Sequence, residues 1–321
     1  MNFNVNVGVG AVFKLVVRKA DTDEIVHETP EFHNLVLTTG LARMAVGTWI
    51  DRCCVGTGNS NPVASQVALD SFLASTTTTA TGASNTGGIQ VTTAPFYWFG
   101  RSIWRFAVGV ATGNISEIGL GWGNSNLWNR ALVKDIEGNP TTITVLADEY
   151  LDVISEVRVY PKESTGSFNL VDKLGAVISE HTYKTQPYIY SNGSNAGAHF
   201  IATGIKFGNV GNGYNSFHIS DAAMPISVNN PITAKFSKNA NTQETNIAGI
   251  AIKTIVTSSE AIFTHRSFQA QISGLMSWVS NNGGTSSGLG YKWEINLPIP
   301  KDAETILTYS FTLAWGNYVP E

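Results

Sequence analysis

The carboxylates within residues 145–161 are the side chains of this sequence with the clearest potential for chemistry. Asp148, Asp152 and Glu156 are separated by even numbers of residues, so on a β-strand all three share one face. Such a row could bind a hard cation such as calcium, or supply a carboxylate for glycoside hydrolysis. However, Arg158 shares that face, and no glycine-rich turn with acids two residues apart is present. We therefore expect a solvated strand face, exposed or facing basic residues of a neighbouring subunit.

Ser286 is a candidate nucleophile, because residues 284–288 fit the pattern G-x-S-x-G. That pattern forms a nucleophile elbow only where a hydrophobic strand precedes it and a helix follows it. Residues 281–283 and 289–291 instead have the composition of a loop. We expect no catalysis by Ser286.

The residues that commonly bind metals or phosphates are scattered along the chain. No pair of histidines has the spacing of a helical zinc site, and the adjacent Cys53 and Cys54 lack the two-residue gap of a zinc knuckle. The glycine-rich segments 8–10 and 208–213 lack the Lys-Ser or Lys-Thr of a phosphate-binding loop. The sequence therefore predicts no enzyme, no catalytic residue, no cofactor and no metal ligand. The six histidines are His27, His33, His181, His199, His218 and His265.

A dense aromatic cluster is formed by residues 96–99 together with Trp104 and Phe106. In a sugar-binding protein such a platform would stack on pyranose rings. In a β-sandwich it would be core on one face and subunit contact on the other. We favour core and interface, because aromatic side chains dominate the energetics of both.

Composition limits the classes of partner. The chain has 321 residues, of which 43% are hydrophobic and only 14% charged, with a formal net charge of −4. A nucleic-acid-binding domain would be strongly basic, so no nucleic-acid partner is expected. The first residues do not resemble a signal peptide, and no run of 18 apolar residues predicts a membrane span. The only cysteines, Cys53 and Cys54, are adjacent and form no disulfide framework, so we expect a chain that folds in a reducing cytoplasm.

Apolar residues recur with a period of two rather than 3.6. Leu151, Val153, Val157 and Val159 alternate with polar residues, as in a half-buried antiparallel strand. The pattern recurs along the chain, and turn signals separate the segments. It predicts an all-β fold of two antiparallel β-sandwich, jelly-roll-like domains with a few short helices.

Two short helices and one loop are expected in the first half. One helix spans about residues 41–49. Another begins with Asn61 as its cap and Pro62 at its first position, because Ala64, Ala68 and Phe72 would share a face. The Thr/Ser/Gly-rich residues 75–88 are expected to form an exposed loop.

A domain boundary is expected at residues 161–167, which divides the chain into domains 1–160 and 161–321. The two halves share a weak order of elements. Residues 115–120 correspond to 247–252, residues 130–132 to 266–268, and the strand with Val153 to the strand with Leu307. The second domain could therefore be a diverged duplicate of the first.

Residues 12–160 contain an ordered series of motifs that resembles a group of tailed-bacteriophage virion proteins, often found among tail genes. Each motif alone is weak, but their order makes the match moderately specific, and it covers about half of the chain. The second half departs from it. The motifs occupy residues 13–30, 32–41, 55–62, 113–120, 130–135 and 138–145, followed by the acidic segment 145–161.

The resemblance implies a structural subunit of a bacteriophage virion, most simply of the tail tip, baseplate or neck. Its partners would be other virion proteins and copies of itself, and its location the virion, after assembly in the host cytoplasm. The low charge suits a subunit of a symmetric assembly.

Two alternatives stay open from the sequence. One is a carbohydrate-binding adhesin or receptor-binding module of the tail, with the aromatic cluster and the Thr-rich loop as its recognition surface. The other is a polysaccharide-degrading enzyme, which needs two carboxylates facing each other across a groove.

Overall fold

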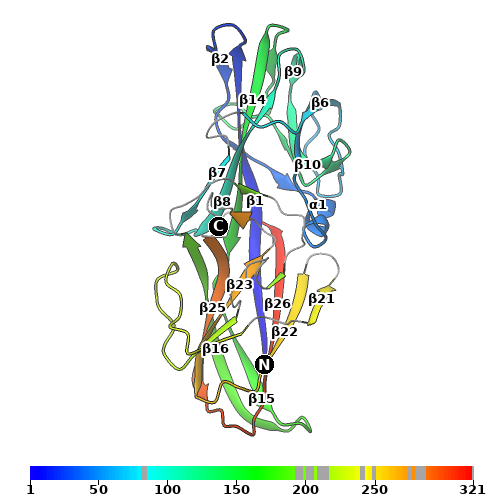
Figure 1. Cartoon of the computed structure of the whole chain (residues 1–321). Helices are drawn as coiled ribbons and strands as arrows, with labels where there is room; N and C mark the ends of the chain where they lie inside the picture. Colours follow the sequence, from blue (N-terminus) through cyan, green and yellow to red (C-terminus); the bar gives the residue numbers. More distant parts are fainter. Residues whose placement is uncertain are drawn as a thin grey trace.

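One strand, β1 (Asn2–Lys19), runs along an elongated molecule and links its two ends (Figure 1). The computed structural model describes residues 1–80, 85–191, 198–199, 206–207, 217–238, 243–247, 251–273, 277–278 and 287–319. In β1 the side chains of Phe13, Leu15 and Val17 are fully buried, as the alternation of a strand that covers a core requires.

The largest sheet is built around β1. β14 pairs with it antiparallel through Val7–Lys19, and β26 pairs with it parallel through Asn2–Val9. The strand order is β21-β22-β26-β1-β14-β8-β7, with β2 and β3 also pairing with β1. Besides β1, the strands are β2 (Ile25–Glu28), β3 (Phe32–His33), β7 (Asn85–Gln90), β8 (Tyr97–Phe106), β14 (Glu149–Pro161), β21 (Gln243–Ile247), β22 (Ala251–Ser258) and β26 (Leu307–Asn317).

A second sheet and the helix belong to the end of the molecule where β1 meets β2 (Figure 1). Ile118 and Leu120 of this sheet share one buried cluster with Phe13 of β1. The elements are β4 (Leu35–Val36), α1 (Thr38–Arg43), β5 (Arg52–Gly56), β6 (Phe72–Thr76), β10 (Glu117–Gly123), β11 (Asn126–Leu127) and β12 (Asn129–Leu132), beside the pair β9 (Gly113–Ile115) and β13 (Ile143–Val145).

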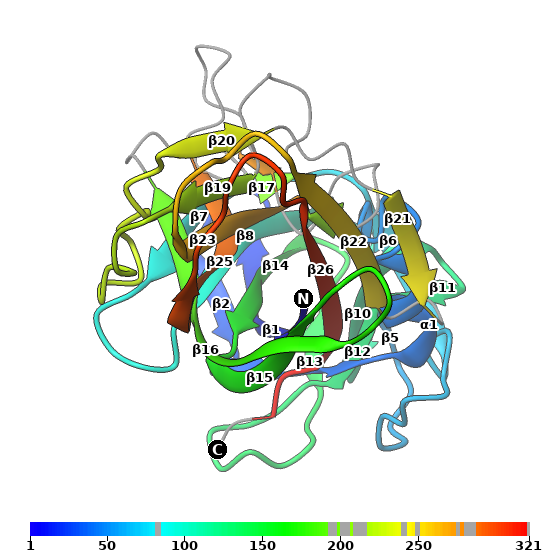
Figure 2. The same cartoon turned by 90° about the horizontal axis from the view of Figure 1, so that it is seen from below.

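A third sheet, at the other end, surrounds the beginning of β1 (Figure 2). The Phe3 ring centroid lies 5.3 Å from that of Phe168, 5.0 Å from Tyr183 and 4.8 Å from Phe268. The sheet contains β15 (Ser164–Val171), β16 (Val177–Ser191), β25 (Ser287–Ile299), β23 (His265–Ser273), β19 (Phe217–Ser220), β20 (Phe236–Lys238) and β18 (Lys206–Phe207); β17 (Ala198–His199) and β24 (Ser277–Trp278) form a separate pair.

The predicted all-β fold class is confirmed, since strands make up 57% of the residues and helix 2%. Pairing is antiparallel in several sheets, and the parallel pair of β1 and β26 departs from the expected pattern. This pair also joins segments on the two sides of the expected boundary at residues 161–167, which overlaps the end of β14 and the start of β15. The halves thus share one sheet. Their division into domains 1–160 and 161–321, and their origin by duplication, stay predictions.

The expected helices need correction. The first is shorter and earlier than residues 41–49, because α1 ends at Arg43. No helix follows Pro62: residues 61–71 form neither helix nor strand, and Phe72 begins β6. The backbone N–H groups of Asp70 and Ser71 donate to the distant Glu117 carboxylate, so a tertiary contact replaces the helical bonds.

The expected loop at residues 75–88 is interrupted by regular structure. β6 continues to Thr76 and β7 begins at Asn85, while residues 81–84 lie outside the described part of the chain.

Phe3 should be essential to the stability of the end that it fills. Phe3→Ala removes a fully buried ring from among other aromatic rings, which should lower the free energy of unfolding by about 3–5 kcal/mol. Urea unfolding tests this. The exposed Ile306 provides a control, since Ile306→Ala should leave the midpoint nearly unchanged. Equal midpoints for Phe3→Ala and the wild type would contradict the packing.

Candidate functional site

The acidic face of β14 is an ion-pair ladder formed within the chain. β8 lies beside β14 in a register that places Arg105 opposite Asp152 and Arg101 opposite Glu156. Two nitrogens of Arg105 donate to the two oxygens of Asp152 at 2.8 and 2.6 Å. Arg101 donates to one Glu156 oxygen at 2.6 and 3.0 Å, and Arg158 donates to the other at 2.7 Å.

The expectation that this face is solvated is therefore wrong for two of its three acids. The side chains of Asp152 and Glu156 are only 8% and 7% exposed. Asp148 is exposed and lies 3.0 Å from Lys19. The basic partners come from β1, β8 and β14 rather than from a neighbouring subunit. The oxygens of Asp152 and Glu156 accept hydrogen bonds from arginine nitrogens. The ladder is therefore a structural network of charge-assisted hydrogen bonds.

A second network, which the sequence reading missed, is centred on Glu117 and Arg130. Both side chains are fully buried, and Arg130 Nε donates to Glu117 Oε2 at 2.8 Å. Arg130 also donates to Asp70 at 2.8 Å and to Gln66 at 3.0 Å. Glu117 accepts backbone N–H bonds from Gly58, Asp70 and Ser71 at 2.8–3.0 Å. A buried charge pair of this kind needs such additional bonds to offset its desolvation.

Two glycines lie where the chain approaches this network closely. A Cβ on Gly56 would lie 2.7 Å from Glu117 Oε1, and one on Gly58 would lie 2.4 Å from it. The motifs around residues 55–62, 113–120 and 130–135 thus meet at one buried carboxylate. Their order along the sequence was the only signal for this site, since the residues are far apart in the chain.

Lys292 is another buried charge with unusual surroundings. It is fully buried on β25, and its Nζ donates to the carbonyls of Pro225, Ser227 and Asn230 at 3.1, 2.6 and 2.8 Å. Burial lowers the pKa of Lys292 to about 8. A lysine with a lowered pKa can act as a nucleophile or base when substrate reaches it. Here three carbonyls accept hydrogen bonds from Nζ, so Lys292 holds residues 225–230 against the sheet.

The remaining sequence candidates do not come together. Ser286 and the glycines of 208–213 lie outside the described residues. Cys53 and Cys54 are free and buried, and burial raises the pKa of both thiols, that of Cys54 to about 12. His265 is buried and contacts Tyr309 Oη, and burial lowers its pKa. Within the described part of the chain, no three His, Cys, Asp or Glu side chains could hold one metal ion.

The aromatic cluster divides between the two faces of β8. Trp98, Trp104 and Phe106 are buried in the core, as the core interpretation predicts. Tyr97 and Phe99 lie on the other face and are half-buried. A subunit contact by this face stays a prediction.

The hairpin of β15 and β16 carries exposed apolar side chains at its tip. Leu174 is 93% exposed, and Val171, Val177 and Ile178 are also exposed; these four residues are called the apolar tip below. In the described part of the chain β15 pairs with β16 alone, so its outer edge is open.

Comparison with protein families, curated proteins and solved structures gives no match to this chain. Among the described residues, no helix is long and apolar enough to cross a membrane.

Breaking the Glu117–Arg130 pair should be costly. Glu117→Gln leaves the guanidinium without its carboxylate in a buried site, which should lower the free energy of unfolding by roughly 3–5 kcal/mol. The exposed pair of Lys235 and Asp221 supplies the control, because Asp221→Asn should change stability little. Denaturant unfolding measures both. If the two variants lose the same small amount, the network does not organise this end of the molecule.

Lys292 should give stability a specific pH dependence. Below about pH 8 the folded and unfolded states both keep its proton, and burying the charge lowers stability. Between about 8 and the ordinary value of 10.5, the folded state loses a proton that the unfolded state keeps. The free energy of unfolding contributed by Lys292 must then rise with pH. Urea unfolding at a series of pH values should show the free energy of unfolding of the wild type rising across this window relative to that of Lys292→Met. A difference between the two proteins that stays constant with pH would contradict the lowered pKa.

Proposed function

We propose that the chain is a structural subunit of a bacteriophage virion, part of the tail at its tip, baseplate or neck, and that it acts through subunit–subunit contacts rather than catalysis. The observation that carries the proposal is the apolar tip beside the open edge of β15. The ordered motifs that resemble tail proteins indicate which assembly the chain would join, namely a phage tail.

The apolar tip and the edge of β15 favour pairing with another chain. An open edge offers unpaired backbone groups as a template for a further strand, and natural monomers block it with charges or proline. Residues 164–171 contain neither. Leu174, at the hairpin turn, exposes nearly its whole side chain to water, and fully burying one such side chain contributes roughly 1.5–3 kcal/mol.

The charged side chains support a role without catalysis. Asp152, Glu156 and Glu117 are each held by arginines, and Lys292 by carbonyls. A general acid or base must reach a substrate proton, and these groups are committed to intramolecular bonds. The proposal therefore includes no enzyme activity, cofactor or metal. The partners are copies of the chain and other virion proteins, without nucleic acid or membrane insertion, in the virion after cytoplasmic assembly.

The aromatic cluster lends little support to an adhesin, the alternative function. Its largest rings, Trp98 and Trp104, are buried in the core, where they cannot stack on a sugar.

Polar substitution of the apolar tip should weaken assembly. Light scattering would compare the wild type with Leu174→Ser/Ile178→Ser, alone and co-expressed with virion proteins. Losing two side chains of this size should weaken association by at least roughly tenfold. Ile136, exposed outside the hairpin, provides the matched control, and Ile136→Ser should assemble as the wild type does. A wild-type chain that stays monomeric at high concentration and binds no virion protein would refute the proposal.

A further inference from the structure

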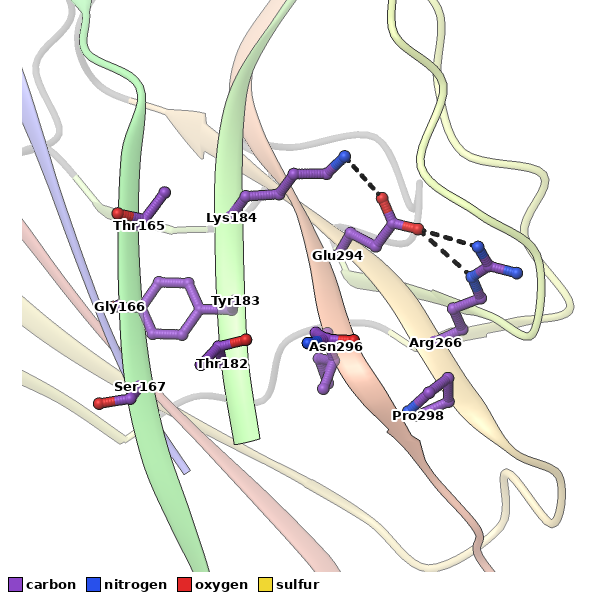
Figure 3. A pocket seen from close by; sticks show the side chains of 11 residues that line it. Thr165, Gly166, Ser167, Thr182, Tyr183, Lys184, Arg266, Glu294, Asn296 and Pro298 are labelled. Carbon is purple, nitrogen blue, oxygen red and sulfur yellow. Dashed lines mark hydrogen bonds and ion pairs between the residues drawn. The ribbon is translucent and has the colours of Figure 1, made fainter. Parts of the chain in front are cut away.

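The outward face of the third sheet carries a groove of about 800 Å³ that none of the preceding contacts uses (Figure 3). It lies across β15, β16, β25 and β23. Its volume is in the range of ligand sites. The side chains that line this groove are mostly polar, and it is called the polar groove below.

Strand register builds the floor of the polar groove in rows. Thr165 of β15 lies opposite Lys184 of β16, which lies opposite Glu294 of β25. Two residues further along, Ser167 lies opposite Thr182. Since side chains two apart share a face of a sheet, the rows present charges beside hydroxyls.

The charges of the polar groove are unequal in number and in exposure. Lys184 Nζ lies 3.0 Å from Glu294, and Arg266 lies 3.2 Å from the other Glu294 oxygen. The two cationic side chains are 57% and 44% exposed, whereas Glu294 is 16% exposed. The carboxylate thus lies between two cations and orients them (Figure 3). A ligand that lies between Lys184 and Arg266 meets two cations and the one less exposed carboxylate of Glu294, and the guanidinium can donate further bonds to a carboxylate.

Side chains with hydroxyl and amide groups line the polar groove beside these charges. Ser167, Thr182 and Asn296 line the groove, and Pro298 borders it. Hydroxyls and amides both donate and accept hydrogen bonds, which suits a ligand rich in hydroxyl groups. Tyr183, Ile295 and Pro298 add apolar surface to the lining.

A second hollow of about 460 Å³ extends the polar groove along β15 and β16. The two share Thr165 and Lys184. Glu163 lines the second hollow beside Met224 and Ile226. The latter two flank Pro225, whose carbonyl Lys292 holds together with that of Ser227. The joined hollows form an elongated site, which fits a chain of several units better than a single small molecule.

We propose that the polar groove binds a carbohydrate chain that carries carboxylates, with Lys184 and Arg266 pairing with a sugar carboxylate and Thr165, Ser167, Thr182 and Asn296 bonding to ring hydroxyls. This site is separate from the apolar tip, so it does not depend on the assembly role.

Calorimetric titration of the full chain tests the site with two probes, an oligogalacturonate and a neutral galactose oligomer of the same length. The acidic oligomer should bind, and the neutral one should bind at least roughly tenfold more weakly, because it lacks the charge-assisted bonds. Lys184→Gln/Arg266→Gln should weaken binding of the acidic oligomer by a similar factor. Lys235, an ion-paired exposed lysine outside the groove, provides the control Lys235→Gln, which should bind as the wild type does.

Three results would overturn the proposal: no binding of the acidic oligomer, equal binding of the neutral oligomer, or equal weakening by Lys235→Gln. Both substituted residues of the groove are exposed, and thermal unfolding verifies that the double variant keeps the wild-type fold. If it does not, the single variants Lys184→Gln and Arg266→Gln give the same comparison.

Discussion

The buried pair of Glu117 and Arg130 is the interaction on which one end of this molecule depends. Residues 57–71 form no strand or helix, so their backbone groups need partners from elsewhere. Glu117 accepts three of their N–H bonds, and Arg130 binds the side chains of Gln66 and Asp70. Glu117, a carboxylate that the sequence did not single out, thus acts as the internal anchor of a long connection.

The same principle governs the other charges of the interior. A charge that folding removes from water must be paired or hydrogen-bonded, and the arginines opposite Asp152 and Glu156 and the carbonyls around Lys292 meet that need. The groups with apparent catalytic potential are consequently occupied in holding strands and connections together. In the described part of the chain, the surfaces that we propose for partners are the apolar tip with its open edge, and the polar groove. Both belong to the third sheet, on the half of the chain where the resemblance to tail proteins is absent.

Local pattern predicted the strands but could not predict their partners. Alternation in residues 151–159 identified β14, because side-chain period depends only on neighbours in sequence. Whether Asp152 meets water depends on β8, whose arginines face it only through strand register. The expected helix after Pro62 failed for a related reason, since Glu117 takes the N–H groups of Asp70 and Ser71. The parallel pairing of β1 with β26 joins the two ends of the sequence, a contact that no local pattern encodes.

We propose that the chain works through contacts at the third sheet while its buried charges are structural. Hydrogen exchange, measured on the chain alone and on the chain co-expressed with virion proteins, tests this most directly. The account predicts that amides of residues 164–178, from the edge of β15 through the apolar tip, exchange more slowly in the assembly. Unchanged exchange in this hairpin, with slowing confined to other surfaces, would contradict it.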